Sequence, residues 1–574
     1  MIRIIPHKLP ASSTVGQLLM TVASVALAAY AAWLWILFFP SFHHPVALLD
    51  SMVDFAFVAH PRSALEFVFE HHNEHVIAII RAASLVDMHC CQLRYGVHQA
   101  IALVALATTI AGLGALVFVN VPSWTMRVGG SAAVAAILLA PCLMPIAAFP
   151  YFLLHPLITP LQAGCAFFAY RLALGEAGHG RQLANAIATT FFALLCLVTG
   201  GSGIVVALLA VALPPLMLRA KASTRWLPHA LIATLLVVLW LIAVRPYAAS
   251  DALLGALAQP MQSLVYFLRI LGAPAYFAWP NPSVGLVAGI PLLIAALGAV
   301  ALTAIHRRRF PLLAVICATL ILGHLASAAL AAVARSSLAG AAAETPKYAY
   351  YAYVIIAASL VIGFAAGARR EIAKLAVLAA GVVLALVAMR STSVFVAERE
   401  FFRTTETLEY ALAQSIEVPQ TRTLLAASSP AILARLVALL ETARERNLNF
   451  FSEPPFKLIG QRLQGAAAHG CQGNVDARST LETRGGEPAV ELTGWAFASA
   501  MGRNRSVLVV ADDMVVGAGE FTTVRPDVVA NLGLHISAFT PIEWRAFAPV
   551  AASAPIRIGI YDRDSGETCL LPAS

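Results

Sequence analysis

The fold of this chain is decided by stretches such as VHQAIALVALATTIAGLGALVFV, which occupies residues 97–119 and contains no Asp, Glu, Lys or Arg. A helix needs about twenty apolar residues to cross roughly 30 Å of hydrocarbon. The 574 residues are 60% hydrophobic and 12% charged, whereas a soluble domain is about half apolar and about a quarter charged. We therefore expect a mainly α-helical, polytopic membrane protein.

Similar apolar stretches predict about eleven transmembrane helices in all. They lie near residues 15–39, 97–119, 130–148, 151–172, 183–199, 203–218, 227–244, 284–305, 310–333, 348–366 and 372–390. The basic residues of the short loops fall on alternate sides, so the positive-inside rule makes the N-terminus cytoplasmic. These residues are Arg127; Arg171 and Arg181; Arg219, Lys221 and Arg225; Arg307, Arg308 and Arg309; and Arg369, Arg370 and Lys374.

In this topology three longer loops, near 40–96, 245–283 and 334–347, face the non-cytoplasmic side together with the chain after the last span. The basic residues lie between apolar segments and not along one face, which argues against a nucleic-acid partner. Membrane lipids are the expected surroundings.

The last third of the chain predicts two parts that follow a membrane domain of residues 1–394. Residues 395–470 carry apolar positions at helical spacing and predict a helical neck. Residues 471–574 contain short β-rich runs between Gly and Asp turns, which predict a small β-sandwich. Cys471 and Cys569 bracket the sandwich, and we expect them to form a disulfide in an oxidising compartment.

The first outer loop contains a dense group of polar residues, FEHHNEH at positions 69–75, followed by Arg81 and Asp87. If residues 64–88 are helical, Glu70, Glu74 and Arg81 lie within about 40° of one another on one face. Polar clusters beside apolar spans are candidates for function. The competing interpretation is an amphipathic helix that rests on the membrane surface.

The third outer loop adds cations at its two ends, Arg335 and Lys347, and the latter is followed by Tyr348. Cations on the outer side suit an anionic ligand such as a lipid phosphate or pyrophosphate. The alternative is that the basic residues reach the interface as anchors and that the tyrosine belongs to an interfacial belt.

These motifs resemble a family of bacterial multi-pass membrane proteins that are similar to GT-C superfamily glycosyltransferases. The family's first outer loop carries His-Asn-Glu-His-Arg and then an arginine and an aspartate, and a later loop carries an arginine, a glycine and an Arg-Tyr pair. Val76 and Lys347 stand where the family pattern has arginine. The corresponding residues are His72-Asn73-Glu74-His75, Arg81 and Asp87; Arg335, Gly340, Lys347 and Tyr348; and, in the tail, Gly494-Trp495-Ala496 and Arg525-Pro526-Asp527-Val528.

The resemblance implies a GT-C-like fold in a bacterial inner membrane, with the tail in the periplasm. It also implies transfer of a sugar from a polyprenyl-phosphate donor to a hydroxyl of a glycan, lipid or protein. This reaction needs a carboxylate base and cations that stabilise the departing phosphate. We expect Glu74 to be the base, with Asp87, Glu70 and Asp54 as successive alternatives. The residues expected to bind substrate are His72, Asn73, His75, Arg81, Arg335, Lys347 and Tyr348.

Two other functions stay open. His71, Glu74 and His75 fit the His-x-x-Glu-His pattern of zinc peptidases, and the same groups could hold a divalent ion in a glycosyl-transfer site. A lipid or glycan transporter or flippase would instead need charges within the spans, where His155 and His324 are isolated.

Overall fold

The computed structural model describes most of the chain as two compact units. The first unit comprises Met1–Leu37, Val68–Ala82 and His98–Phe395, and the second comprises Phe38–Phe67, Ala83–Val97 and Val396–Ser574. The described residues are 11–42, 52–72, 75–175, 178–218, 223–244, 259–335, 345–367, 371–424, 430–463, 471–498, 504–531 and 540–572.

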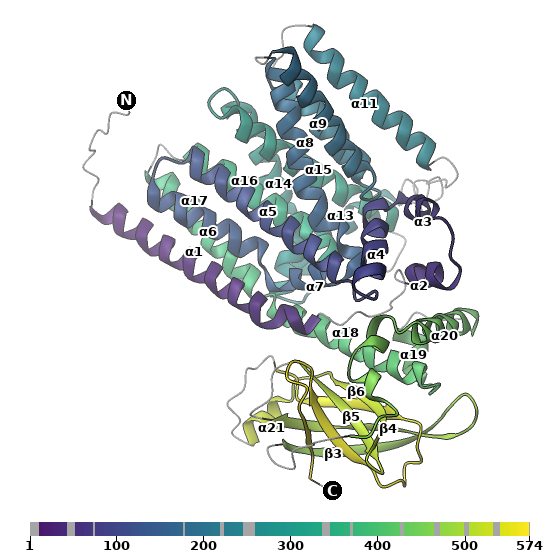
Figure 1. Ribbon diagram of the computed structural model, residues 1–574. Coiled ribbons are helices and arrows are strands. Elements are labelled where there is room, and N and C mark those ends of the chain that lie inside the picture. Colours follow the sequence, from purple (N-terminus) through teal and green to yellow (C-terminus); the bar gives the residue numbers. More distant parts are fainter. Residues whose placement is uncertain are drawn as a thin grey trace. The chain divides into compact units, whose positions relative to one another are not determined.

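The first unit is a bundle of helices (Figure 1). Eight helices of the described ranges are long and apolar enough to cross a membrane, or nine if a pair bent by 50° near Pro141 counts as one span. The structure therefore supports a multi-pass membrane protein. The number of helices that are long and apolar enough to span is smaller than the predicted number of about eleven. The helices are α1 (Ala11–Phe38), α5 (Gly96–Asn120), α6 (Trp124–Leu138), α7 (Met144–Ala148), α8 (Leu154–Leu174), α9 (His179–Leu197), α10 (Gly203–Leu218), α11 (Ser223–Val244), α13 (Pro260–Ala278), α14 (Pro282–His306), α15 (Pro311–Arg335), α16 (Pro346–Gly367) and α17 (Glu371–Met389).

Helix α16 forms the centre of this bundle. It packs against α6, α13, α14, α15 and α17, and Tyr350, Tyr353 and Phe364 on it are almost completely buried. Apolar helices at the edge of the bundle, such as α14, keep exposed apolar side chains, whereas most of the side chains of α16 are buried. The start of α16, at the end of the third predicted outer loop, is consequently held in a defined place within the unit.

Helix α13 is an element that the sequence analysis missed, because it lies within the predicted outer loop 245–283. It runs antiparallel to α14, and the two backbones touch at glycines. A Cβ atom on Gly272 would lie 1.7 Å from the carbonyl oxygen of Gly285, and one on Gly289 would lie 2.0 Å from that of Leu268. Small residues allow this close approach of helices in membranes. Arg269 interrupts the apolar run of α13 and hides it from a search for spans.

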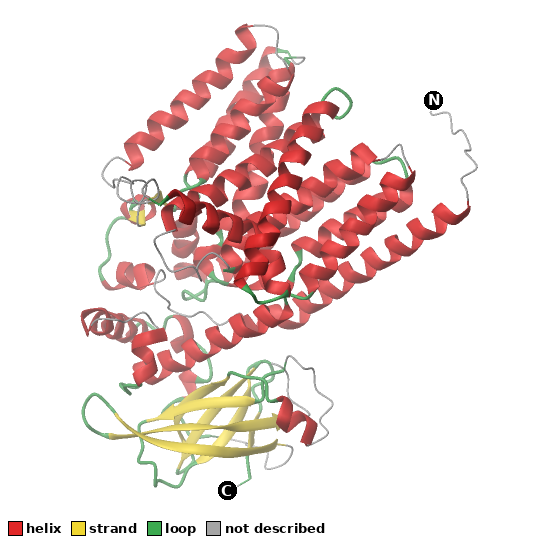
Figure 2. Cartoon of the chain, turned by 180° about the vertical axis from the view of Figure 1, so that it is seen from behind, coloured by secondary structure: helices red, strands yellow, loops and turns green. Residues whose placement is uncertain are grey.

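The second unit contains one antiparallel sheet of seven strands in the order β3-β4-β7-β6-β5-β8-β9 (Figure 2). The predicted two-sheet sandwich is not confirmed, because the described strands all join this single sheet, which curves into a half-barrel. The elements are α2 (Met52–Ala59), α18 (Thr392–Ala413), α19 (Pro419–Leu424), α20 (Pro430–Glu445), α21 (Pro526–Asn531), β3 (Cys471–Glu482), β4 (Pro488–Ala498), β5 (Arg505–Ala511), β6 (Met514–Phe521), β7 (Glu543–Ala548), β8 (Arg557–Asp562) and β9 (Thr568–Leu570).

The sheet buries apolar side chains on both faces, which explains the sandwich-like pattern of the sequence. Leu492 and Ala496 of β4 belong to a core around Trp544, while Ala489 of the same strand packs with Leu408 of α18. Neighbouring positions along a strand point to opposite faces. The second layer expected as a sheet is therefore formed by helix α18.

The predicted disulfide between Cys471 and Cys569 is confirmed, with 5.9 Å between the Cα atoms. Its cysteines belong to β3 and β9, which are the two edge strands of the sheet. Unpaired strand edges are sites of unwanted association. The disulfide joins the edges of the half-barrel and so replaces the hydrogen bonds that would close a full barrel.

The contact between α13 and α14 yields a test of the bundle. Gly272→Ala should lower the stability of the detergent-solubilised protein by about 1–3 kcal/mol, because the new methyl group would overlap the backbone of α14. Gly298→Ala, on α14, is the matched control, since nothing lies within 4 Å of its Cβ position. Thermal unfolding of both variants measures the difference, and equal stabilities would contradict the observed packing.

Candidate functional site

The polar segment of the first outer loop is a hairpin and not part of one long helix. Helix α3 (Ala64–Phe69) ends before it, β1 (His71–His72) pairs with β2 (His75–Val76), and α4 (Ala78–Cys90) follows. The prediction of a continuous helix over 64–88 is therefore wrong. The strands pair antiparallel, with His71 opposite Val76 and His72 opposite His75.

The most specific sequence motif falls at this hairpin. Asn73 and Glu74 lie outside the described residues, as do the side chains of His71, His72 and His75. The expected roles of these five residues therefore stay predictions.

Glu70 and Arg81 do lie together, although the hairpin separates them in sequence. Nη1 of Arg81 donates to the backbone oxygen of Glu70 at 2.8 Å and to its Oε2 at 3.1 Å. The side chain of Arg81 is 1% exposed and that of Glu70 is 34% exposed. A buried guanidinium is stable only with such partners. The pair thus combines an enclosed positive charge with a carboxylate that solvent can reach.

The other two predicted carboxylates are fully buried and accept hydrogen bonds from neighbouring groups. Asp87 accepts from the backbone N–H groups of Tyr95, at 2.6 Å, and Val97, at 3.0 Å. Asp54 accepts from the hydroxyls of Ser84, at 3.0 Å, and Tyr95, at 3.1 Å. These contacts give both residues a structural task, which is to hold the turn between α4 and α5. Of these three carboxylates, Glu70 is the one that solvent reaches.

The turn after α4 is strained and is attached to the C-terminal part of the second unit. Gln92, Leu93 and Tyr95 have φ values of 55°, 57° and 58°, a conformation that costs energy for residues other than glycine. The N–H of Asn449 donates to the oxygen of Gln92 at 2.7 Å, and its Nδ2 donates to that of Leu93 at 2.9 Å.

Arg94 of the same turn forms an ion pair with Glu453 at 2.8 Å. Residues 83–97 of the predicted outer loop and the tail therefore belong to one unit. We call these contacts of residues 91–95 with residues 449–453 the loop–tail anchor.

Lys347 lies at the start of α16 among aromatic side chains of the first unit. Its Nζ is 5.4 Å from the ring centroid of Phe152 and 5.0 Å from that of Tyr348. His155 stacks edge-on against Tyr348 at 6.2 Å. The buried Nδ1 of His155 has no hydrogen-bond partner within the described structure. An unsatisfied buried nitrogen beside a cation marks a place where a ligand or water can bind.

Further aromatic and polar side chains lie next to His155 within the first unit. Tyr351 lies against both His155, at 5.3 Å, and His324, at 5.9 Å. Nε2 of His324 is 3.0 Å from Oγ1 of Thr159. The two histidines that the sequence analysis treated as isolated thus belong to one buried aromatic and polar cluster. Of the other predicted residues in the third loop, Arg335 is the last residue of α15. Gly340 lies outside the described residues.

A series of contacts links the surroundings of Arg81 with those of Lys347. Nε2 of His98 lies 3.0 Å from the oxygen of Ile80, the residue before Arg81. Gln99 donates to the oxygen of Ala148 at 3.3 Å. The ring of Phe149 then lies 4.6 Å from that of Phe152, which Lys347 approaches. These contacts all lie within the first unit, which contains both Arg81 and Lys347.

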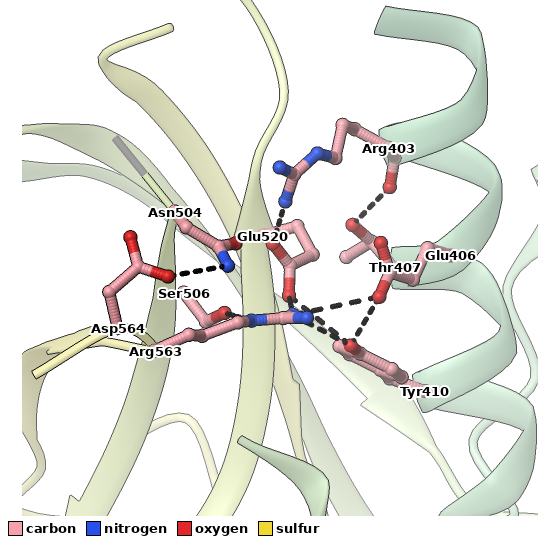
Figure 3. Close-up of polar contacts among 9 residues, drawn as sticks. All are labelled: Arg403, Glu406, Thr407, Tyr410, Asn504, Ser506, Glu520, Arg563 and Asp564. Carbon is pink, nitrogen blue, oxygen red and sulfur yellow. Dashed lines mark hydrogen bonds and ion pairs between the residues drawn. The ribbon is translucent and has the colours of Figure 1, made fainter. Parts of the chain in front are cut away.

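A buried polar cluster that the sequence analysis missed joins α18 to the sheet (Figure 3). Glu520 of β6 pairs with Arg403 at 2.5 Å and also with Arg563. Tyr410 donates to Glu406 at 2.6 Å. Exposed fractions from 0% to 8% leave no access for a substrate. The spacing of Arg403, Glu406 and Tyr410 along one helix face was the one available signal.

The environment of Glu406 shifts its ionisation. Burial raises the pKa of Glu406, and the negative charge of Glu520 acts in the same direction. Glu520 itself pairs with Arg403 and Arg563. A carboxyl with a raised pKa stabilises the fold in acid, and this contribution is lost as the pH rises through the raised value.

Comparisons of this chain with known proteins found no match. No family model, curated protein or solved structure matches this chain. In the described ranges, no group of three His, Cys, Asp or Glu residues is arranged to hold a metal ion. The proposal for function therefore depends on the motifs and on the geometry around Arg81 and Lys347.

The buried cluster predicts unequal effects of two similar substitutions. Glu520→Gln should destabilise the second unit by about 3–5 kcal/mol, because it removes the anion that pairs with two buried guanidinium groups. Glu406→Gln, the matched control, should cost less than about 1 kcal/mol near neutral pH and should weaken the pH dependence of stability. Chemical unfolding followed over a range of pH tests both effects, and equal destabilisation would show that the carboxylates are equivalent.

Proposed function

We propose that this chain is a membrane glycosyltransferase that moves a sugar from a polyprenyl-phosphate donor to an acceptor hydroxyl at the outer face. The observations that support the proposal are the Glu70–Arg81 pair and the aromatic surroundings of Lys347, which both belong to the first unit. A donor phosphate needs enclosed cations, and an acceptor needs an accessible carboxylate. We propose that these residues supply both.

In the reaction, the acceptor oxygen attacks the anomeric carbon while the bond from that carbon to the phosphate oxygen breaks. The proton of the hydroxyl passes to the carboxylate, and the negative charge develops on the departing phosphate. Arg81 and Lys347 would stabilise this charge, and they do so more effectively away from bulk water. His155 would contribute its unpaired nitrogen to the polar head of the donor.

Glu74 is the proposed base, on the strength of the motif. Glu70 is the described alternative, because it is 34% exposed and already lies beside a guanidinium. Asp54 and Asp87 become weaker choices, since neighbouring hydroxyls and backbone N–H groups already donate to their carboxylates. His72, Asn73 and His75 retain their proposed contacts with the substrate as expectations from the motif.

The membrane topology proposed with this function has eleven spans. The loop–tail anchor requires the first outer loop and the tail to share one side, so an even number of spans must lie between them. Eight long apolar helices, one bent pair and two shorter apolar helices together make eleven. One of these precedes the first outer loop and ten follow it. Helix α13 then does not cross, and the tail with its disulfide lies in the periplasm.

Glu74→Gln tests the proposed chemistry. The substitution keeps the size of the side chain but removes the base, so transfer should fall by about 10²–10⁴-fold. Membrane vesicles supplied with a lipid-linked sugar that the unmodified protein uses provide the assay. Glu66→Gln, an exposed position on α3, should retain activity. Full transfer by Glu74→Gln would move the role of base to Glu70, and no transfer from any polyprenyl-linked donor would refute the proposed function.

Labelling of single cysteines in intact cells tests the topology. Cys90 is exposed, and Asp513→Cys introduces a thiol in the tail. Both should react with a membrane-impermeant maleimide when the other cysteines, apart from the disulfide, are replaced. Arg308→Cys should react only after permeabilisation. Labelling of positions 308 and 513 from the same side would contradict the eleven-span topology.

A further inference from the structure

Two neighbouring cysteines, Cys90 and Cys91, lie at the end of α4, where the loop–tail anchor begins. Cys90 is exposed and Cys91 is half-buried, whereas the other four free cysteines are buried in the first unit. A thiol reacts only where a reagent can reach it. This pair is therefore the accessible group of thiols among the described cysteines.

The two thiols are in contact with each other. The hydrogen bond with the thiol of Cys90 raises the pKa of Cys91 to about 11, and burial acts in the same direction. Cys91 consequently keeps its proton at neutral pH. The exposed sulfur of Cys90 is the one that a reagent in solution meets first, and the sulfur of Cys91 is directly beside it.

The unit that contains this pair also contains a disulfide. Residues 83–97 and the tail, with its bond between Cys471 and Cys569, belong to the second unit. Disulfides persist in oxidising compartments, and the parts of one compact unit share a compartment. Cys90 and Cys91 therefore meet the same oxidising conditions, and this conclusion does not depend on the proposed function.

A disulfide between neighbouring cysteines changes the backbone that carries them. Adjacent Cα atoms lie about 3.8 Å apart, which is less than the roughly 4.4–6.8 Å that disulfides usually span. Such a bond is strained and is easily reduced again. Successive side chains of a helix also do not face each other. Closing the ring must therefore move the peptide between the two cysteines out of its helical geometry.

This peptide is part of the turn that the tail contacts. The N–H of Cys91 donates to the oxygen of Asp87 at 2.8 Å, and the oxygen of Cys91 accepts from the N–H of Arg94 at 3.1 Å. Both hydrogen bonds weaken when the peptide moves. The carbonyl groups of Gln92 and Leu93, which lie between these residues and accept from Asn449, then lose their fixed position.

We propose that Cys90 and Cys91 form a redox-active pair that small-molecule disulfides oxidise, and that this oxidation loosens the loop–tail anchor. The sulfur of Cys90 attacks a disulfide R–S–S–R, its proton passes to the departing sulfur, and one R–SH leaves. The sulfur of Cys91 then attacks that of Cys90, its proton passes to the second departing sulfur, and another R–SH leaves. Two thiols of the protein are thus oxidised while one external disulfide is reduced to two thiols.

Incubation of the purified full-length protein with oxidised glutathione, followed by alkylation and mass spectrometry, tests the chemistry. The tryptic peptide 82–94 contains both cysteines of the pair and no others. It should lack two hydrogen atoms and should carry neither glutathione nor an alkyl group. In the matched variant Cys91→Ser, Cys90 should instead carry one glutathione. Reduced glutathione should restore the pair, whereas the bond between the buried Cys471 and Cys569 should stay intact.

Hydrogen–deuterium exchange of the two redox forms tests the effect on the loop–tail anchor. Residues 449–453 should exchange at least about fivefold faster in the oxidised form, because the N–H of Asn449 loses its acceptor. In the double variant Cys90→Ser/Cys91→Ser, treatment with oxidised glutathione should leave this exchange unchanged.

Three results would overturn the proposal. The first is a peptide 82–94 in which both cysteines remain free for alkylation after oxidised glutathione, and the second is a peptide that carries glutathione without the internal bond. The third is equal exchange of residues 449–453 in the oxidised and reduced forms, which would show that the anchor does not respond to the pair. Disulfide-linked dimers through Cys90 in place of the internal bond would likewise refute it.

Discussion

The carboxylate of Asp87 accepts hydrogen bonds from the backbone N–H groups of Tyr95 and Val97 and so holds the turn between α4 and α5. The conformation of the turn and its contact with the tail depend on this interaction. It keeps three residues other than glycine in a left-handed conformation, and these residues present the carbonyl groups that Asn449 binds. A buried carboxylate that binds backbone N–H groups supplies the energy that such strain requires.

The loop–tail anchor shows that the C-terminal region is packed against the turn after α4. A domain that merely followed the last span could be attached by a flexible linker, but here the tail contacts the turn that ends α4. Helix α18 is in turn attached to the sheet through Glu520 and its two arginines. These contacts hold the turn after α4 in a defined conformation within the second unit.

The buried charges of the two units have different surroundings. Glu520 pairs with both Arg403 and Arg563 in an enclosed volume, and Glu406 also lies near Arg563. Asp54 and Asp87 accept hydrogen bonds from hydroxyls or backbone N–H groups. Arg81 is buried beside the partly exposed Glu70, and the buried Nδ1 of His155 has no hydrogen-bond partner within the described structure.

The sequence by itself determined the membrane class, most of the spans, the division into a helical and a β-rich part, and the disulfide. Apolar length, alternation along strands and cysteine position are local properties that the chain shows directly. Only the tertiary structure decided that the polar segment is a hairpin, that α13 enters the bundle, and that the layer over the sheet is α18. It also decided that Asp87 holds a turn while Glu70 meets Arg81. These outcomes depend on which distant groups satisfy each hydrogen bond and charge, and spacing along the chain does not contain that information.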